Sequence, residues 1–292
     1  MAARQVLPFG AFGGRRAVDG TNIIAYFNDR MPAESLAHLS LRHENLVIYT
    51  GYHAMPSLTI LFGISYDISL QDMMQSVFEE CALKYTLVSM LSALKFLCDQ
   101  KAPCITLSEQ YIYFTDQGVL KILTHREYCE KNPIDIIGSP ETIIGLKGYR
   151  YSSSTWIAGM MMRKILNGAQ PMFPGNPTRI DMLFAILTID FSEIADTRFP
   201  ETNDIVEWCT EKIVQIGGKT FAFKRSGAQE LTEQDMIAVR RVRATADEIL
   251  AHPWAVYSQE AYDAWFTSAC SARSARAAHA AHAARAAPTY SE

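Results

Sequence analysis

The chain has 292 residues, of which 49% are hydrophobic and 20% charged, a composition that excludes wholesale disorder and allows a large core. Its formal net charge of −4 provides no basic surface for nucleic acid, so no nucleic-acid partner is expected. No run reaches the roughly 18 apolar residues of a membrane span, and the N-terminus lacks the apolar segment of a secretory signal. We therefore expect no membrane partner and no secretion.

The six cysteines predict an intracellular protein. They form no C-x-x-C pair and are spread along the chain, a pattern that favours reduced thiols over a disulfide framework. The histidines and cysteines in the body of the chain lack the spacing of a zinc site, so no metal is predicted. We expect the protein in the cytoplasm or the nucleus.

Residues 1–63 predict a small, sheet-rich first domain. Residues 1–20 are rich in glycine and arginine without a clear period, and we expect the glycine-rich stretch at 10–14 to be flexible. Residues 32–39 predict a short helix with a proline in its first turn. Short apolar runs typical of strands occur at residues 22–27, 46–49 and 58–62.

From residue 71 onward the pattern changes to one dominated by helices. Apolar residues between 83 and 98 recur with a helical period, which predicts a long helix with a buried face. Two strands at 111–114 and 119–123 are expected to form a hairpin, with Gly118 supplying the turn. Residues 156–166 are apolar nearly all round, which is typical of a central buried helix that ends at Asn167 and Gly168.

Further helices are predicted toward the C-terminus. Residues 180–189 form one helical pattern, and residues 230–265 form an amphipathic pattern interrupted at His252 and Pro253. We place the second domain at residues 64–266. The remaining residues, 267–292, are a low-complexity Ala/Arg/His segment with a period near three, which predicts a frayed or disordered tail; the alternative is a weakly basic docking segment.

Several motifs occur in a fixed order along the chain. Residues 104–107 read CITL, and residues 124–126, twenty positions after Cys104, read THR. They are followed by SPE at 139–141, and then by the longest string, which includes GYRYSSSTWIAGMMM and PMFPGNPTRIDMLFAIL. Upstream stands RHENLV at 42–47, and downstream stand RATA at 243–246 and LAHPW at 250–254.

Together these motifs resemble the eukaryotic protein-kinase domain, and within it the cyclin-dependent kinase group, over roughly residues 20–255. The resemblance implies an α+β, bilobal protein-kinase-like fold. Its small, reduced N-lobe would be the sheet-rich unit at 1–63, and its larger helical C-lobe would be residues 64–266.

The resemblance also implies that the catalytic groups are replaced. Phosphoryl transfer in that family needs Mg²⁺, a lysine on the phosphates and an aspartate that accepts the hydroxyl proton. None of the side chains at the corresponding positions supplies a carboxylate or an ammonium group. The phosphate lysine falls at Phe27, or at Tyr26 in a register shifted by one; the catalytic aspartate falls at Thr106, the loop lysine at Ser108, and the two magnesium ligands at Tyr111 and Thr124.

Positions that support the fold persist. The resemblance implies a buried ion pair between Glu141 and Arg243. Glu34 falls at the position of a helix glutamate whose lysine partner is gone, and the aspartate of the central helix falls at Ser154. The full set of retained structural positions is Glu34, Pro140, Glu141, Trp156, Gly159 and Arg243.

The interpretation is a cyclin-dependent-kinase-like pseudokinase, a scaffold or regulatory module that binds a protein partner, an active kinase being one such partner. No cofactor and no magnesium site are expected. Weak ATP binding stays open, in a pocket formed by Ala25, Phe62 and Tyr113. Cyclin binding is not predicted, because residues 28–34 do not match the family's cyclin-reading helix.

Two alternatives remain. The chain would be a divergent serine/threonine protein kinase if it bound ATP and phosphorylated protein through an atypical site, with Glu109 as the one carboxylate inside the loop. In the other alternative, the N-lobe is too reduced to fold, and the helical part alone serves as a docking surface.

Overall fold

The computed structural model describes residues 11–15, 22–29, 38–56, 58–64, 66, 68–102, 107–123, 139–143, 150–168, 198–216, 219–224, 227–232 and 242–286. The chain is a mixed α+β protein with small antiparallel sheets and several helices. The positions of Glu34, Thr106 and Thr124 lie outside the described residues, as do residues 32–37 of the first predicted helix and the helix predicted at 180–189.

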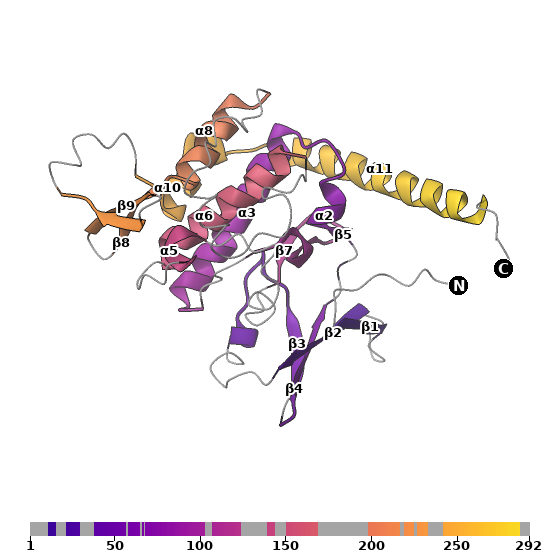
Figure 1. Ribbon diagram of the computed structural model, residues 1–292. Helices are drawn as coiled ribbons and strands as arrows, with labels where there is room; N and C mark the ends of the chain where they lie inside the picture. Colours follow the sequence, from indigo (N-terminus) through magenta and orange to yellow (C-terminus); the bar gives the residue numbers. More distant parts are fainter. Residues whose placement is uncertain are drawn as a thin grey trace, which may run out of the picture.

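The first sheet is built from the N-terminal part of the chain (Figure 1). Its strands follow the order β1-β2-β4-β3 and are all antiparallel to their neighbours. The strands predicted at 22–27 and 58–62 are confirmed. The flexibility expected of residues 10–14 is wrong for residues 11–14, because residues 11–15 pair with β2 along their whole length. The strands are β1 (Ala11–Arg15), β2 (Asn22–Asp29), β3 (Tyr49–Ala54) and β4 (Leu58–Ile64).

The strand predicted at 46–49 begins later than expected, at Tyr49. The reason is that the preceding residues bond to a different sheet. The Val47 amide donates to the Ile122 carbonyl (2.9 Å), and the Ile122 amide donates to the Asn45 carbonyl (2.8 Å). This parallel bridge joins the N-terminal sheet unit to the hairpin of the helical part.

That hairpin is confirmed. β6 (Ile112–Phe114) and β7 (Leu120–Ile122) are antiparallel, and β5 (Ile68–Ser69) adds a short third strand beside β6. Gly118 has a φ of +80°, which favours glycine at this turn.

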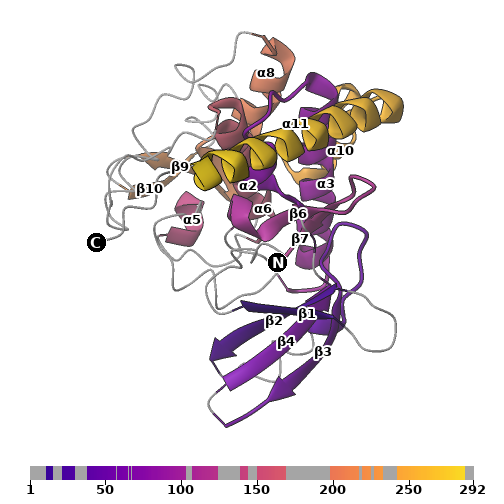
Figure 2. The same ribbon diagram turned by 90° about the vertical axis from the view of Figure 1, so that its right-hand side faces the viewer.

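The helices pack into one hydrophobic core, with α3 and α6 side by side at its centre (Figures 1 and 2). The long helix predicted around 83–98 is confirmed as α3, and the central helix predicted at 156–166 is α6, which begins earlier and ends before Gly168 at a φ of +63°. The helices are α2 (Leu70–Met73), α3 (Glu80–Asp99), α5 (Pro140–Ile143), α6 (Arg150–Leu166), α8 (Pro200–Cys209), α10 (Ala246–Leu250) and α11 (Gln259–Ala286). Short 3-10 turns are η1 (His38–Ser40), η2 (Glu109–Tyr111) and η5 (Pro253–Ala255).

One helix within the described ranges, α3, is long and apolar enough to cross a membrane by length and composition. Its mean hydropathy is 1.4, and 67% of the apolar stretch is buried inside the structure. A buried core helix passes the same test, and α3 makes its contacts with α6, α8, α10 and α11.

The helical pattern expected at 230–265 is wrong at its start, because residue 230 ends a strand, residues 227–230. Residues 233–241 lie outside the described part of the chain, and the next described helix begins at Ala246. This strand belongs to a sheet that was not predicted, because its strands are short, with four to six residues each. The sheet consists of β8 (Ile213–Ile216), β9 (Lys219–Lys224) and β10 (Gly227–Glu230), in the order β10-β9-β8.

The C-terminal segment is also more ordered than expected. α11 runs without a break from Gln259 to Ala286, so the boundary placed at residue 267 falls inside a helix. Alanine has the highest helix propensity of all residues, and the low-complexity sequence therefore extends the helix. Arg273 contacts Asp72 of α2 (3.4 Å), and Arg276 donates to the Ser76 hydroxyl (3.3 Å).

The first half of α11 is anchored in the core by aromatic residues. The Tyr262 ring stacks on Tyr85 of α3 with centroids 3.9 Å apart, and its hydroxyl donates to the Gly118 carbonyl. The Trp265 indole donates to the Val77 carbonyl (2.9 Å). Figure 2 shows α11 crossing the helical part on the side that carries α2 and α3.

Candidate functional site

The candidate site lies where the N-terminal sheet meets η2 and the β6–β7 hairpin. A second hydrophobic cluster fills this junction. Tyr111 and Tyr113 belong to it and are only 8% and 7% exposed. The Tyr66 and Tyr113 rings lie 6.4 Å apart. The cluster is completed by Leu39, Val47, Tyr49, Leu61 and Leu123.

The predicted pocket residues are brought together in part. Ala25 pairs directly with Phe62 across β2 and β4, and Phe27 pairs with Ile60 two positions along. Tyr113 lies on β6, in a different sheet, and is buried in the cluster at the junction. Two of the three predicted pocket residues are therefore neighbours, and the third is packed among apolar side chains.

Glu109, the carboxylate of the loop, is engaged by α6. Its Oε1 lies 2.5 Å from the Lys164 ammonium, and its Oε2 accepts from the Ser108 hydroxyl at 3.2 Å. The exposed fractions of the Lys164 and Glu109 side chains are 11% and 8%. The ion pair thus connects η2 to α6.

The expected ion pair between Glu141 and Arg243 is present. The Arg243 guanidinium contacts the Glu141 carboxylate at 2.5 Å, and both side chains are 0% exposed. The Arg243 Nε donates to the Glu211 carbonyl (2.7 Å), and the guanidinium carbon lies 4.7 Å from the centroid of the Trp156 ring. Three predicted structural residues, Glu141, Arg243 and Trp156, therefore form one buried assembly.

The other retained positions are also sites of packing. Pro140 is the first residue of α5, a position at which the missing N–H removes no hydrogen bond of the helix. A Cβ on Gly159 would lie 2.6 Å from the Cys209 Cβ, so glycine lets α6 approach α8 closely. Ser154, at the position of the central-helix aspartate, lies with its hydroxyl 3.0 Å from the Cys98 sulfur, an uncharged contact between α6 and α3.

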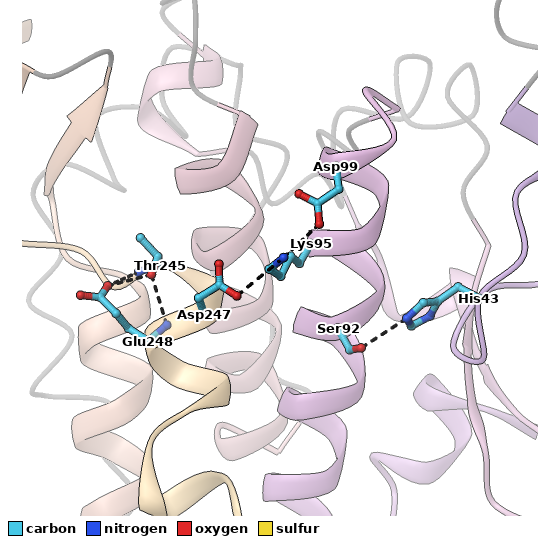
Figure 3. A network of polar contacts seen from close by, with 7 residues as sticks. All are labelled: His43, Ser92, Lys95, Asp99, Thr245, Asp247 and Glu248. Atoms are coloured by element: carbon cyan, nitrogen blue, oxygen red, sulfur yellow. Dashed lines mark hydrogen bonds and ion pairs between the residues drawn. The ribbon is translucent and has the colours of Figure 1, made fainter.

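A line of polar contacts connects α3 to its surroundings (Figure 3). Lys95 bonds Asp99 one turn along α3 (2.9 Å) and reaches Asp247 of α10 (3.6 Å). These contacts, led by the hydrogen bond that Lys95 donates to Asp99, raise the pKa of Lys95 above its ordinary value. α10 itself is started by a capping box between Thr245 and Glu248.

On the opposite side of α3, His43 links the helix to the N-terminal sheet unit (Figure 3). Its Nδ1 accepts from the Asn45 amide (3.1 Å), so the neutral ring carries its proton on Nε2 and donates it to the Ser92 hydroxyl (3.3 Å). Burial, and to a smaller extent the Lys121 ammonium, lower the pKa of His43, while the Glu44 carboxylate partly opposes this shift.

The lowered pKa of His43 predicts a pH dependence of stability. The folded protein binds this proton less readily than the unfolded chain, whose pKa is near 6.5. The His43 contribution is therefore constant above about pH 6.5, and it falls as the pH drops below that value. Urea denaturation at a series of pH values below about 6.5 measures how the free energy of unfolding depends on pH. The slope of that dependence should be smaller for His43→Asn than for the wild-type protein. The same change at His279, exposed on α11, should leave the slope unaltered; equal slopes for the wild-type protein and His43→Asn would contradict the prediction.

Sequence reasoning missed Lys164 and His43. A signal existed for Lys164, because a charged residue on a helix that is otherwise apolar all round must find a buried partner. His43 had no such signal, since its role depends on the approach of Ser92, 49 residues away along the chain.

Within the described ranges, no group of three or more His, Cys, Asp or Glu side chains is placed to hold a metal ion. The four cysteines of those ranges, Cys81, Cys98, Cys209 and Cys270, are not in disulfide bonds. None of the models of known protein families matches the chain.

Proposed function

We propose that the chain is a cyclin-dependent-kinase-like pseudokinase, a protein-interaction or regulatory module that does not transfer phosphate. In this proposal the β1–β4 sheet belongs to a reduced N-lobe and the helical part forms the C-lobe of a bilobal protein-kinase-like fold. The partner is a protein, with an active kinase as one kind, and the protein acts in the cytoplasm or nucleus.

The observation that carries the proposal is the contrast between two groups of positions. Glu141 and Arg243, where the resemblance places a structural ion pair, are buried and bonded to each other. Tyr111, where it places a magnesium ligand, is buried in an apolar cluster. A phenol packed among apolar side chains is a poor ligand for Mg²⁺, which prefers carboxylate oxygens and water.

Two further observations favour a module without catalysis. Ser108, at the position of the loop lysine, is bonded to Glu109 and has no positive charge to place on a phosphate. Glu109 is itself bonded to Lys164. The charged groups of this loop thus stabilise its attachment to α6.

The direct test is incubation of the purified protein with labelled ATP, with Mg²⁺ or Mn²⁺, and with generic protein substrates. We expect no transfer above that of a blank without protein, and no metal-dependent thermal shift with ATP. An active cyclin-dependent kinase in the same assay is the positive control. Robust transfer that Ala25→Trp abolishes, by filling the nucleotide space, would overturn the proposal in favour of the divergent kinase.

A further inference from the structure

We infer that a cleft between α8, α3 and η5 binds a basic peptide segment of a partner protein. This inference rests on the proposed function as an interaction module and names its docking surface and the chemistry of its partner. The cleft has a volume of about 580 Å³, within the roughly 300–1,000 Å³ of typical ligand sites. It is lined by Lys84 of α3, the first turns of α8, and residues 252–254.

The walls of the cleft are preformed. Trp254 is 4% exposed, and its indole donates to the Thr202 hydroxyl of α8 at 3.3 Å. The His252 Nδ1 accepts from the Trp254 amide at 3.1 Å. Pro200 and Pro253 stand at the starts of α8 and η5, where their rings fix the backbone. A surface already held in place loses little conformational entropy when a partner binds.

The charge of the cleft is negative. Glu201 and Asp204 line it from α8 and are exposed. The Lys84 ammonium lies 3.1 Å from the Glu80 carboxylate and 5.7 Å from the centroid of the Trp254 ring. The lining residues thus carry two carboxylates and one ammonium, a formal charge of −1, and the ammonium is already paired with Glu80. The α8 sequence, PETNDIVEWC, adds a third acidic residue and contains no lysine or arginine.

This combination selects a basic peptide. Arginine and lysine place a cation on carboxylates, and the aliphatic part of their side chains covers apolar surface. The cleft offers both, because Pro200, Ile205 and Pro253 stand beside the two carboxylates of α8. A simple cation would make no contact with the apolar wall, and an acidic peptide or a nucleotide would be repelled by the carboxylates.

The probe is a fluorescein-labelled pentapeptide of sequence Leu-Arg-Lys-Leu-Arg with a blocked N-terminus, followed by anisotropy at low salt. We expect saturable binding that weakens as ionic strength rises above about 0.1 M. Glu201→Lys should weaken it by at least about tenfold, because it replaces attraction with repulsion inside the cleft. Glu207→Lys is the matched control, since Glu207 is exposed on the same helix and does not line the cleft; it should change affinity by less than about twofold.

Three results would overturn the inference: no binding of the basic peptide, equal binding of the acidic peptide Leu-Glu-Asp-Leu-Glu, or equal losses in the two α8 variants, which would indicate diffuse attraction. Thermal melts of both variants establish that they fold. If the protein transfers phosphate and still binds the peptide through Glu201, only the pseudokinase proposal is overturned. If it neither transfers phosphate nor binds the peptide, only the docking inference is overturned.

Discussion

Replacing Glu141 with alanine is expected to lower the free energy of unfolding by about 3–5 kcal/mol, the largest loss predicted for this protein. The substitution leaves the Arg243 guanidinium buried, because Trp156 and the Glu211 carbonyl hold it away from water. A buried charge without its counter-charge is more costly than the pair it came from. Urea denaturation followed by circular dichroism measures the loss.

A double variant separates the ion pair from simple loss of packing. Glu141→Leu combined with Arg243→Met removes both charges, so it should recover most of the stability that either single change loses. The partly exposed pair between Lys84 and Glu80, with side chains 18% and 44% exposed, is the comparison, and Glu80→Ala should cost less than about 1 kcal/mol. A loss of that small size for Glu141→Ala would contradict the prediction, as would a double variant no more stable than the single ones.

The second large effect is expected at Glu109. Glu109→Ala should lower the free energy of unfolding by about 3 kcal/mol, because it leaves the Lys164 ammonium in a pocket that is only 11% exposed. Glu109→Leu with Lys164→Met should restore most of this loss. The measurement is again urea denaturation of the three variants beside the wild-type protein.

The same variants distinguish a structural Glu109 from a catalytic one. A glutamate that acted as a surrogate general base would be needed for transfer but not for stability, so Glu109→Gln would abolish any residual transfer and leave the denaturation midpoint unchanged. The ion pair with Lys164 predicts instead that Glu109→Gln lowers the denaturation midpoint and has no transfer to abolish. A midpoint that does not move in Glu109→Ala would show that Lys164 stabilises the fold without this partner.

The elements predicted most accurately from sequence were those whose residues are repetitive and buried. The apolar period of α3 and the glycine at 118 each have one structural solution, a helix with a buried face and a turn with positive φ. The strands β2 and β4 were likewise visible as short apolar runs. These features depend on residues that are close together in the sequence, and they can therefore be predicted from it.

The errors came from features that depend on distant partners. Residues 45–47 have the composition of a strand, yet they bond to β7 rather than to β4, and no local pattern favours one partner over the other. The alanine-rich segment was predicted to be frayed or disordered because its sequence is of low complexity, although its helix propensity and its attachment to α2 through Arg273 stabilise it. The Glu109–Lys164 pair spans 55 residues and was missed for the same reason.

The anchoring of α11 has a consequence for the order of folding. Tyr262 bonds a turn 144 residues earlier, and Trp265 bonds a carbonyl 188 residues earlier. During synthesis, the surfaces of α3 and the hairpin that these rings cover therefore stay uncovered until α11 has been made. Contacts between such distant residues form late and slowly. The nascent protein consequently exposes an aromatic-binding surface until α11 emerges, and a chaperone is most needed during that interval.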